Sequence, residues 1–294
     1  MRLIGRAAMI VASALLALPA AAQQQRQPDE SGSEIVITGE RVREEQVRDF
    51  VSILTPPRTA SIPRFIDHIC PVTVGLVPAQ NEAVTARLRQ VAAAVSLKVA
   101  GPGCAPNAFV IVTRDKRSFI QALARQRPHS FGMMTALQIR RLARSPGPAA
   151  AWQLSGPVDS DGIPLRYDAA LGMYVNDTSQ PASRIRSISQ EGFDASALVV
   201  ETGALRGLTP IQLADYAAMR LFARLDPARL PAPPPPTILG ILEAPMGTEV
   251  PITMTDWDVG LLRGLYVSAT NLNASGQRSQ IGQQVVKELE KPDR

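Results

Sequence analysis

The sequence is poor in the side chains that most often carry enzyme chemistry. Its 294 residues include only 2 His, 2 Cys and 2 Trp, and aromatic residues make up 4% of the chain. Hydrophobic residues make up 45% and charged residues 19%, which is the balance of a globular protein. This composition excludes a disulfide scaffold, a collagen-like chain and a wholly disordered chain. A globular protein long enough to bury a substantial core remains.

Motifs for nucleophilic, phosphate-binding and dinucleotide chemistry are also missing. The sequence contains no G-x-S-x-G, no G-x-x-x-x-G-K and no G-x-G-x-x-G, so we expect no cofactor. The most chemical-looking pair is Asp215 beside Tyr216 on a predicted helix. Because adjacent helical residues do not face each other, a surface carboxylate and a core tyrosine are favoured over a catalytic pair.

The N-terminus has the pattern of a secretory signal peptide. Two arginines precede an apolar run over residues 7–18, which is too short to span a bilayer, and Ala20 and Ala22 have the spacing that signal peptidase accepts. We predict a signal peptide over residues 1–22, cleaved near Ala22, then a disordered leader over residues 23–33 and no transmembrane segment in the mature chain. The alanine- and arginine-rich composition is typical of bacteria, so the protein is expected in the periplasm or outside the cell.

Positive charge is concentrated in one segment. The chain has a net charge of +5, but residues 114–144 alone hold eight basic residues and one acid. After export, the available polyanions are lipid headgroups, lipopolysaccharide, acidic glycans and acidic protein faces rather than nucleic acid. We expect a basic patch at Arg125, Arg140 and Arg141 that binds an envelope protein or an anionic envelope polymer. The alternative is a solvated face of two helices.

An α+β fold with a mixed β-sheet is predicted. A helix over residues 40–54 is followed by a strand over 72–77, a helix over 79–97 and an apolar strand over 109–112. The order strand, helix, strand predicts a parallel pair joined by a crossover, with C-terminal helices packed on the sheet.

Antiparallel hairpins are predicted after this unit. Residues 150–154 pair with 164–168 across a turn at Asp159–Gly162, and residues 184–189 pair with 197–201 through Glu191–Gly192.

Capping residues predict where several helices start, and a run of prolines predicts a boundary between two segments. Helix starts are predicted directly after Asp115, Thr135, Thr209 and Thr255. We predict an α/β core over residues 34–230, a polyproline linker over 231–236 and a C-terminal helical segment over 237–294.

The two cysteines and two histidines lie in the N-terminal half. In an exported chain, Cys70 and Cys104 are most simply one disulfide, worth about 3 to 4 kcal/mol on the chain-entropy model. The alternative is a zinc site that adds His68 and His129 to the two thiols, but the spacing matches no known zinc pattern.

Residues 34–38, with the sequence EIVIT, resemble the box by which outer-membrane transporters engage the energy-transducing protein TonB. The chain is too short for the roughly 22 strands of such a transporter. The segment predicts a short strand that adds to a sheet edge, either the protein's own, which is favoured, or a partner's.

Longer segments resemble a family of exported, mostly alphaproteobacterial proteins of unknown function. They are LTPIQLADYAAMRLFARL, TILGILEA and MTDWDVGLLRGLYVSA near the C-terminus, and EIVITGE and DHICPVTVGL near the N-terminus. Related families keep a peptidase-like arrangement, with a sheet edge before a helix that carries H-E-x-x-H in zinc peptidases. Here that helix reads Leu213-Ala214-Asp215-Tyr216-Ala217, so the resemblance implies a fold and a compartment without zinc ligands.

Together these features predict an exported, non-catalytic binding or accessory protein of the bacterial cell envelope. The alternative is a degenerate or atypical zincin-like hydrolase with a cleft beside the Thr209–Leu225 helix, where Asp215 and Tyr216 are the candidate catalytic residues. A third possibility is a purely structural protein whose basic patch has no partner.

Overall fold

The computed structural model describes residues 31–57, 59–177, 187–231, 234–245 and 247–291, with side chains from Arg43 onward. Its contacts divide the chain into two units, Met1–Arg43 and Glu44–Arg294. The described part of the first unit is helical. The predicted signal peptide and residues 23–30 of the predicted leader lie outside the described residues.

Seven α-helices and seven strands are present in the described residues. The α-helices are α1 (Ser31–Leu54), α2 (Pro78–Ala94), α3 (Lys116–Gln126), α4 (Ala136–Ala143), α5 (Pro210–Phe222), α6 (Asp256–Val267) and α7 (Ala274–Leu289). The strands are β1 (Arg64–Phe65), β2 (Pro71–Val74), β3 (Ala108–Thr113), β4 (Ala149–Asp159), β5 (Arg166–Asp168), β6 (Met173–Val175) and β7 (Ser189–Glu201). Short 3-10 helices are η1 (Pro128–Phe131), η2 (Thr202–Leu205), η3 (Pro227–Arg229) and η4 (Ile238–Gly240). The predicted α+β class is confirmed.

Strand β7 organises a five-stranded mixed sheet. Strands β1 and β3 pair with it in parallel, β2 continues the sheet in parallel beyond β3, and β4 pairs with it antiparallel. The parallel pairing of β2 with β3 around α2 confirms the predicted strand–helix–strand unit. Strands β5 and β6 form a separate antiparallel pair.

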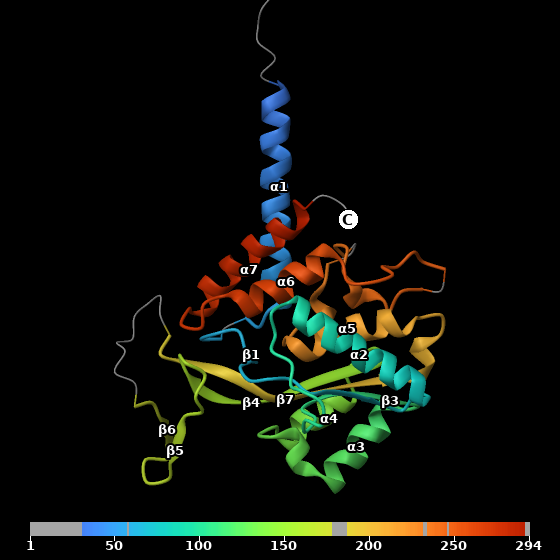
Figure 1. Ribbon diagram of the computed structural model, residues 1–294, viewed down its shortest axis with the longest axis vertical. Coiled ribbons are helices and arrows are strands. Elements are labelled where there is room, and N and C mark those ends of the chain that lie inside the picture. Colours follow the sequence, from blue (N-terminus) through green and yellow to red (C-terminus); the bar gives the residue numbers. More distant parts are fainter. Residues whose placement is uncertain (1–30, 58, 178–186, 232–233, 246, 292–294) are drawn as a thin grey trace, which may run out of the picture. The chain divides into compact units, whose positions relative to one another are not determined.

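Helices cover both faces of the five-stranded sheet (Figure 1). Strand β3 alternates between the two faces. Ala108, Val110 and Val112 belong to the larger hydrophobic cluster with α2, α5, α6 and α7, whereas Phe109 and Ile111 pack in the smaller cluster with α3, η1 and α4. The sheet therefore separates the basic helices α3 and α4 from the rest of the helical layer.

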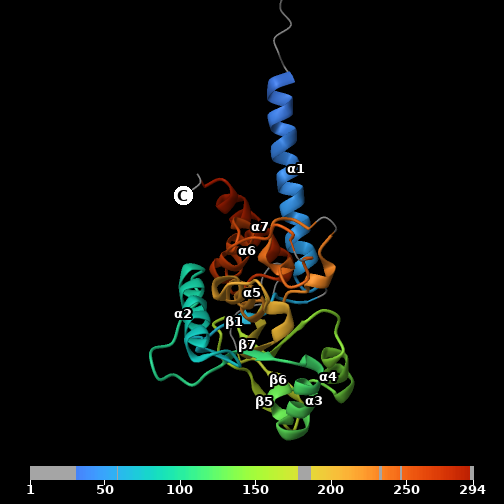
Figure 2. The ribbon, with the colours of Figure 1, turned by 90° about the vertical axis from the view of Figure 1, so that its right-hand side faces the viewer.

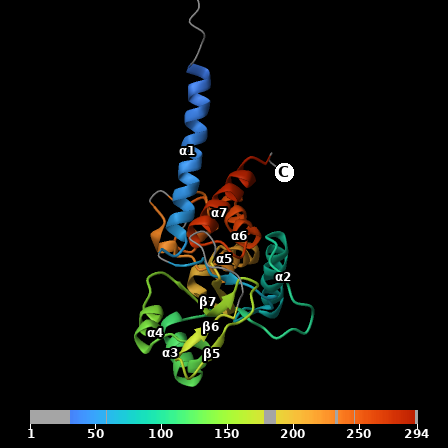
Figure 3. The same cartoon turned by 90° about the vertical axis from the view of Figure 1, so that its left-hand side faces the viewer.

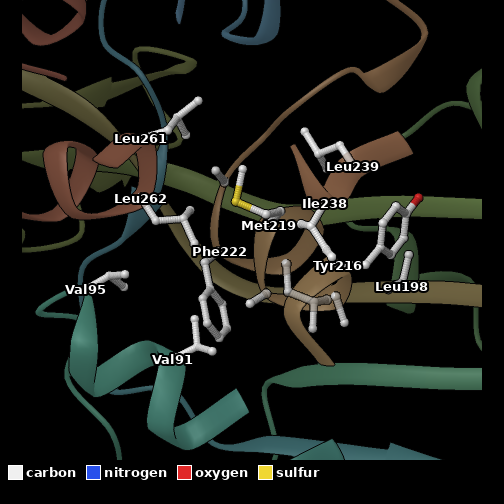
Figure 4. Close-up of a cluster of buried hydrophobic side chains, with 14 of the residues drawn as sticks. Val91, Val95, Leu198, Tyr216, Met219, Phe222, Ile238, Leu239, Leu261 and Leu262 are labelled. Carbon is white, nitrogen blue, oxygen red and sulfur yellow. The ribbon is translucent and has the colours of Figure 1, made fainter. Parts of the chain in front are cut away.

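The larger cluster joins the C-terminal helices to the sheet. Figure 4 shows Met219 and Phe222 of α5 among Val91 of α2, Leu262 of α6 and Leu198 of β7. Residues on both sides of the predicted linker at 231–236 thus share one core and belong to one compact unit.

The predicted strand over residues 34–38 is wrong, because these residues lie within α1. Helix α1 also includes residues 31–33, which were predicted to belong to the leader. β-Branched residues prefer strands by only about 1 kcal/mol, and this preference depends on context. The segment continues a helix whose last turns bury Val47, Phe50 and Leu54, and extending an existing helix is easier than starting one.

Both predicted hairpins are also wrong, although the turn at Asp159–Gly162 is present. Residues 150–154 pair with 195–199 of β7, and across the turn only Val158 and Pro164 form a bridge. Residues 184–186 of the second predicted hairpin lie outside the described residues, but strand β7 runs unbroken through Gly192, so Glu191–Gly192 is not a turn. A Cβ at Gly192 would lie 2.9 Å from Ile66 Cγ1, so this glycine permits close packing rather than a reversal of the chain.

Candidate functional site

Asp215 is fully buried and does not lie on the surface of its helix. Its Oδ1 accepts a hydrogen bond from Arg87 Nε at 2.8 Å. Its Oδ2 accepts from Arg87 Nη2 at 3.1 Å, Thr253 Oγ1 at 2.6 Å and Met254 N at 2.9 Å. The bidentate pair with Arg87 joins α2 to α5, and the other two bonds hold the segment before α6. This saturated set of contacts makes Asp215 a structural anion.

Tyr216 is a core residue on the same helix. Its hydroxyl oxygen accepts a hydrogen bond from Arg220 Nη1 at 2.6 Å, and burial raises the pKa of the Tyr216 hydroxyl. Helix α5 is buried continuously from Gln212 to Met219. Neither Asp215 nor Tyr216 is therefore exposed to a solvent-filled cleft beside α5.

Cys70 and Cys104 form a disulfide, which confirms the predicted bridge and excludes the alternative zinc site, since both thiols are consumed. His68 is exposed, and its Nδ1 lies 2.8 Å from Asp67 Oδ1. His129 lies in η1. Within the described part of the chain, no group of three or more His, Cys, Asp or Glu residues is arranged to hold a metal ion.

The basic segment forms helices α3 and α4 with the predicted caps. Asp115 accepts hydrogen bonds from Ser118 N and Ser118 Oγ, and these bonds lower the pKa of the Asp115 carboxyl. Thr135 and Gln138 form the predicted capping box at the start of α4. The single acid of this segment is thus used in holding the start of α3.

Lys116 differs from the arginines of this segment because its side chain is not on the protein surface. It is buried, and its Nζ donates to the carbonyl oxygens of Ser145 and Gly147, both at 2.7 Å. Burial lowers the pKa of Lys116. The lysine closes the end of α4 against the start of α3, so the charge pattern alone overstated the basic surface by one residue.

A groove of about 650 Å³ lies between α3, η1 and α4. Arg125 on α3 and Arg140 on α4 line it together with His129, so the structure brings two of the three predicted basic-patch residues to one cavity. Arg141 is exposed beside Arg140 but does not line the groove. The other lining residues are neutral: Gln121, Ala124, Pro128, Gly132, Met134, Ala136 and Ile139. The groove therefore combines an apolar wall with two guanidinium groups.

Five exposed arginines of this basic segment have side chains that make no hydrogen bond or ion pair with the described residues. They are Arg125, Arg127, Arg140, Arg141 and Arg144. Elsewhere in the molecule, Arg87, Arg224 and Arg263 are each paired with a carboxylate. The guanidinium groups of α3, η1 and α4 are therefore free for an external anion.

The β5–β6 hairpin is a second exposed feature, and its first strand was predicted to pair with residues 150–154 instead of with β6. Leu171 at its turn is 65% exposed, and Met173 is 57% exposed. The rings of Tyr167 and Tyr174 contact each other edge to face with centroids 5.2 Å apart, and both residues are more than half exposed. The hydrophobic residues between Ile163 and Tyr174 could have indicated this hairpin. The prediction missed it because it paired residues 164–168 with residues 150–154, in the main sheet.

Comparison of this chain with protein-family models, curated proteins and solved structures gives no match. None of the helices described between residues 31 and 291 has both the length and the apolar character of a transmembrane span. The function is therefore inferred from the groove and from the surface around it.

Proposed function

We propose that this chain is an exported, non-catalytic binding protein of the bacterial cell envelope, which holds an anionic partner at the groove between α3 and α4. One observation carries the proposal: Arg125 and Arg140 line an apolar-walled groove, and they belong to a set of five exposed arginines whose side chains have no carboxylate partner among the described residues. Guanidinium groups bind carboxylate and phosphate in a bidentate manner and are weakly hydrated, so they suit such a partner.

Export is supported by the signal-peptide pattern of residues 1–22 and by the disulfide between Cys70 and Cys104, since disulfides persist in oxidising compartments. The resemblance of several segments to an exported alphaproteobacterial family agrees with this compartment. A binding role, rather than a hydrolytic one, agrees with the burial and saturation of Asp215.

The test is binding of a soluble polyanion, fluorescently labelled inorganic polyphosphate, to the purified chain by anisotropy. Arg125→Glu/Arg140→Glu reverses the two charges that line the groove. The matched control is Arg48→Glu/Lys287→Glu, which makes the same change in net charge at exposed residues of α1 and α7.

We expect the groove variant to bind at least tenfold more weakly and the control to change binding less than threefold, because separated surface charges are screened within about 8 Å at physiological salt. Equal losses in the two double variants would show that only net charge matters and would overturn the groove. Unchanged binding in both would show that polyphosphate binds away from Arg125 and Arg140 and would likewise overturn the groove.

A further inference from the structure

A second exposed element, the β5–β6 hairpin, indicates what kind of partner carries the anion of the proposed function. The β5–β6 hairpin pairs with no other strand of the described sheet and carries exposed apolar and aromatic residues at its turn and along its strands. A two-stranded hairpin is marginally stable alone, and a contiguous exposed apolar surface marks an interaction site. The hairpin therefore has the character of a contact element.

The hairpin lies at the same end of the compact unit as the basic helices. Figures 1, 2 and 3 show β5, β6, α3 and α4 together at the end opposite α6 and α7. The hairpin and the helices are set apart along this end, as the view of Figure 1 shows. One flat surface can therefore contact both at once.

The basic helices also expose apolar residues of their own. Met133, in the turn between η1 and α4, is 95% exposed, and Leu137 in the first turn of α4 is 49% exposed. Exposed apolar side chains and unpaired arginine side chains therefore occur together in the segment that ends in α4. This mixture is typical of surfaces that lie at the boundary between lipid headgroups and acyl chains.

Two acids in and beside the hairpin, Asp159 and Asp168, are engaged with the protein. Asp168 pairs with Arg166 at 3.2 Å and accepts a hydrogen bond from Ala170 N. Asp159 accepts from the backbone N–H groups of Asp161 and Ile163. Asp168 is the last residue of β5, and its Oδ1 also accepts a hydrogen bond from Leu171 N at 3.2 Å, so the backbone of the turn itself engages this carboxylate.

We infer that this end of the molecule docks onto an anionic phospholipid surface. The arginines of α3, η1 and α4 bind headgroup phosphates, while Leu171 and Met173 insert among the acyl chains. Tyr167 and Tyr174 are amphipathic, and tyrosine is enriched at the level of the headgroups. The inference rests on the proposed function, since it names the source of the anion as a lipid bilayer.

Charge and planarity favour a bilayer over a protein partner. Each arginine near an anionic bilayer strengthens binding about fivefold, and insertion of a leucine-sized side chain strengthens it by about tenfold or more. A flat anionic surface satisfies the dispersed arginines and the separate hairpin together. An acidic protein face would pair with the arginines, but its acids would offer no apolar environment to the exposed Leu171.

The experiment measures co-sedimentation of the purified chain with vesicles of phosphatidylcholine and phosphatidylglycerol in equal parts, and with phosphatidylcholine alone. The hairpin variant is Leu171→Ser/Met173→Ser. Its control is Ile252→Ser, which removes an apolar side chain that is 81% exposed in the segment before α6, where the neighbouring Pro251 and Thr253 are hydrogen-bonded to α5. The circular dichroism spectrum of each variant confirms that it is folded.

We expect the parent chain to bind the anionic vesicles and not the neutral ones. The hairpin variant should bind at least tenfold more weakly, with polyphosphate binding unchanged, and Ile252→Ser should behave as the parent. A Leu171→Trp variant should shift its fluorescence emission to shorter wavelength on adding anionic vesicles.

Three results separate this inference from the proposed function. Binding of polyphosphate without binding of vesicles overturns the lipid surface and leaves the anion-binding groove standing. Vesicle binding that is unaffected by Leu171→Ser/Met173→Ser overturns insertion of the hairpin. Binding of polyglutamate, but not of vesicles, indicates an acidic protein as the partner and overturns the lipid inference.

Discussion

Replacing Asp215 with Asn tests whether the most chemical-looking residue of the chain is structural. The substitution keeps the shape of the side chain but removes the charge opposite Arg87. If the amide oxygen occupies the Oδ2 position, the contacts with Thr253 and Met254 persist, but the NH2 group then faces the Nε–H of Arg87. Two donors confront each other at a buried site, and the guanidinium loses its counter-ion.

The magnitude follows from the burial of the two partners. Removing one member of a buried ion pair costs about 3 to 5 kcal/mol. The Asp215 side chain is 0% exposed, but that of Arg87 is 31% exposed, so water compensates part of the loss. We expect the free energy of unfolding to fall by about 2 to 3 kcal/mol, which lowers Tm by about 4 to 10 °C in a unit of this size.

Thermal and urea unfolding followed by circular dichroism measure this loss. The control is Asp161→Asn, an exposed carboxylate, which should change stability by about 0.5 kcal/mol or less. In the double variant Arg87→Met/Asp215→Asn, no orphaned cation remains, so the loss should be smaller than the sum of the single losses. If Asp215→Asn were as stable as the parent, the reasoning that this carboxylate holds α2 and α5 together would be refuted.

The remaining predictions concern the disulfide and one charged cluster. Reducing the bridge between Cys70 and Cys104, which are 34 residues apart, should lower the free energy of unfolding by about 3 to 4 kcal/mol, and equal urea midpoints with and without reductant would contradict this. Burial opposes ionisation of Glu288, but hydrogen bonds from Lys291 and Arg263 outweigh it and hold its pKa below 4.5. The stability it contributes is therefore complete above pH 4.5 and is lost as the pH falls through the lower folded-state pKa. Glu288→Gln should flatten the acid limb of the stability curve, and an unchanged limb would exclude this role.

Features encoded by neighbouring residues were predictable from the sequence. The caps at Asp115, Thr135, Thr209 and Thr255 are all present, because a capping box needs only residues three positions apart. The β2–α2–β3 unit was predicted for the same reason, because it follows from local patterns. The disulfide was predicted for a different reason: its cysteines lie 34 positions apart, but the chain offers only one pair. The basic patch at Arg125 and Arg140 was likewise visible as a charge run.

Features that depend on distant residues were not predictable in this way. Strand β4 pairs with β7 from residues about 40 positions away, and apolar alternation does not identify a partner strand. The burial of Asp215 depends on Arg87, which lies 128 positions away. The groove forms only when α3 packs against η1 and α4. The sequence therefore indicated the charges of the groove, but it indicated neither the cavity nor the burial of Lys116.

Buried charged groups and exposed charged groups of this protein differ in what they can do. The buried Asp215 and Lys116 are each held by several fixed partners, and a group held in this way exchanges those partners only at a high cost in free energy. The exposed Arg125 and Arg140 give up only weakly held water when they bind an anion. The surface arginines can therefore bind and release an anion without disturbing the core, and this difference supports the proposal that recognition takes place on the α3–α4 surface rather than along the buried helix α5.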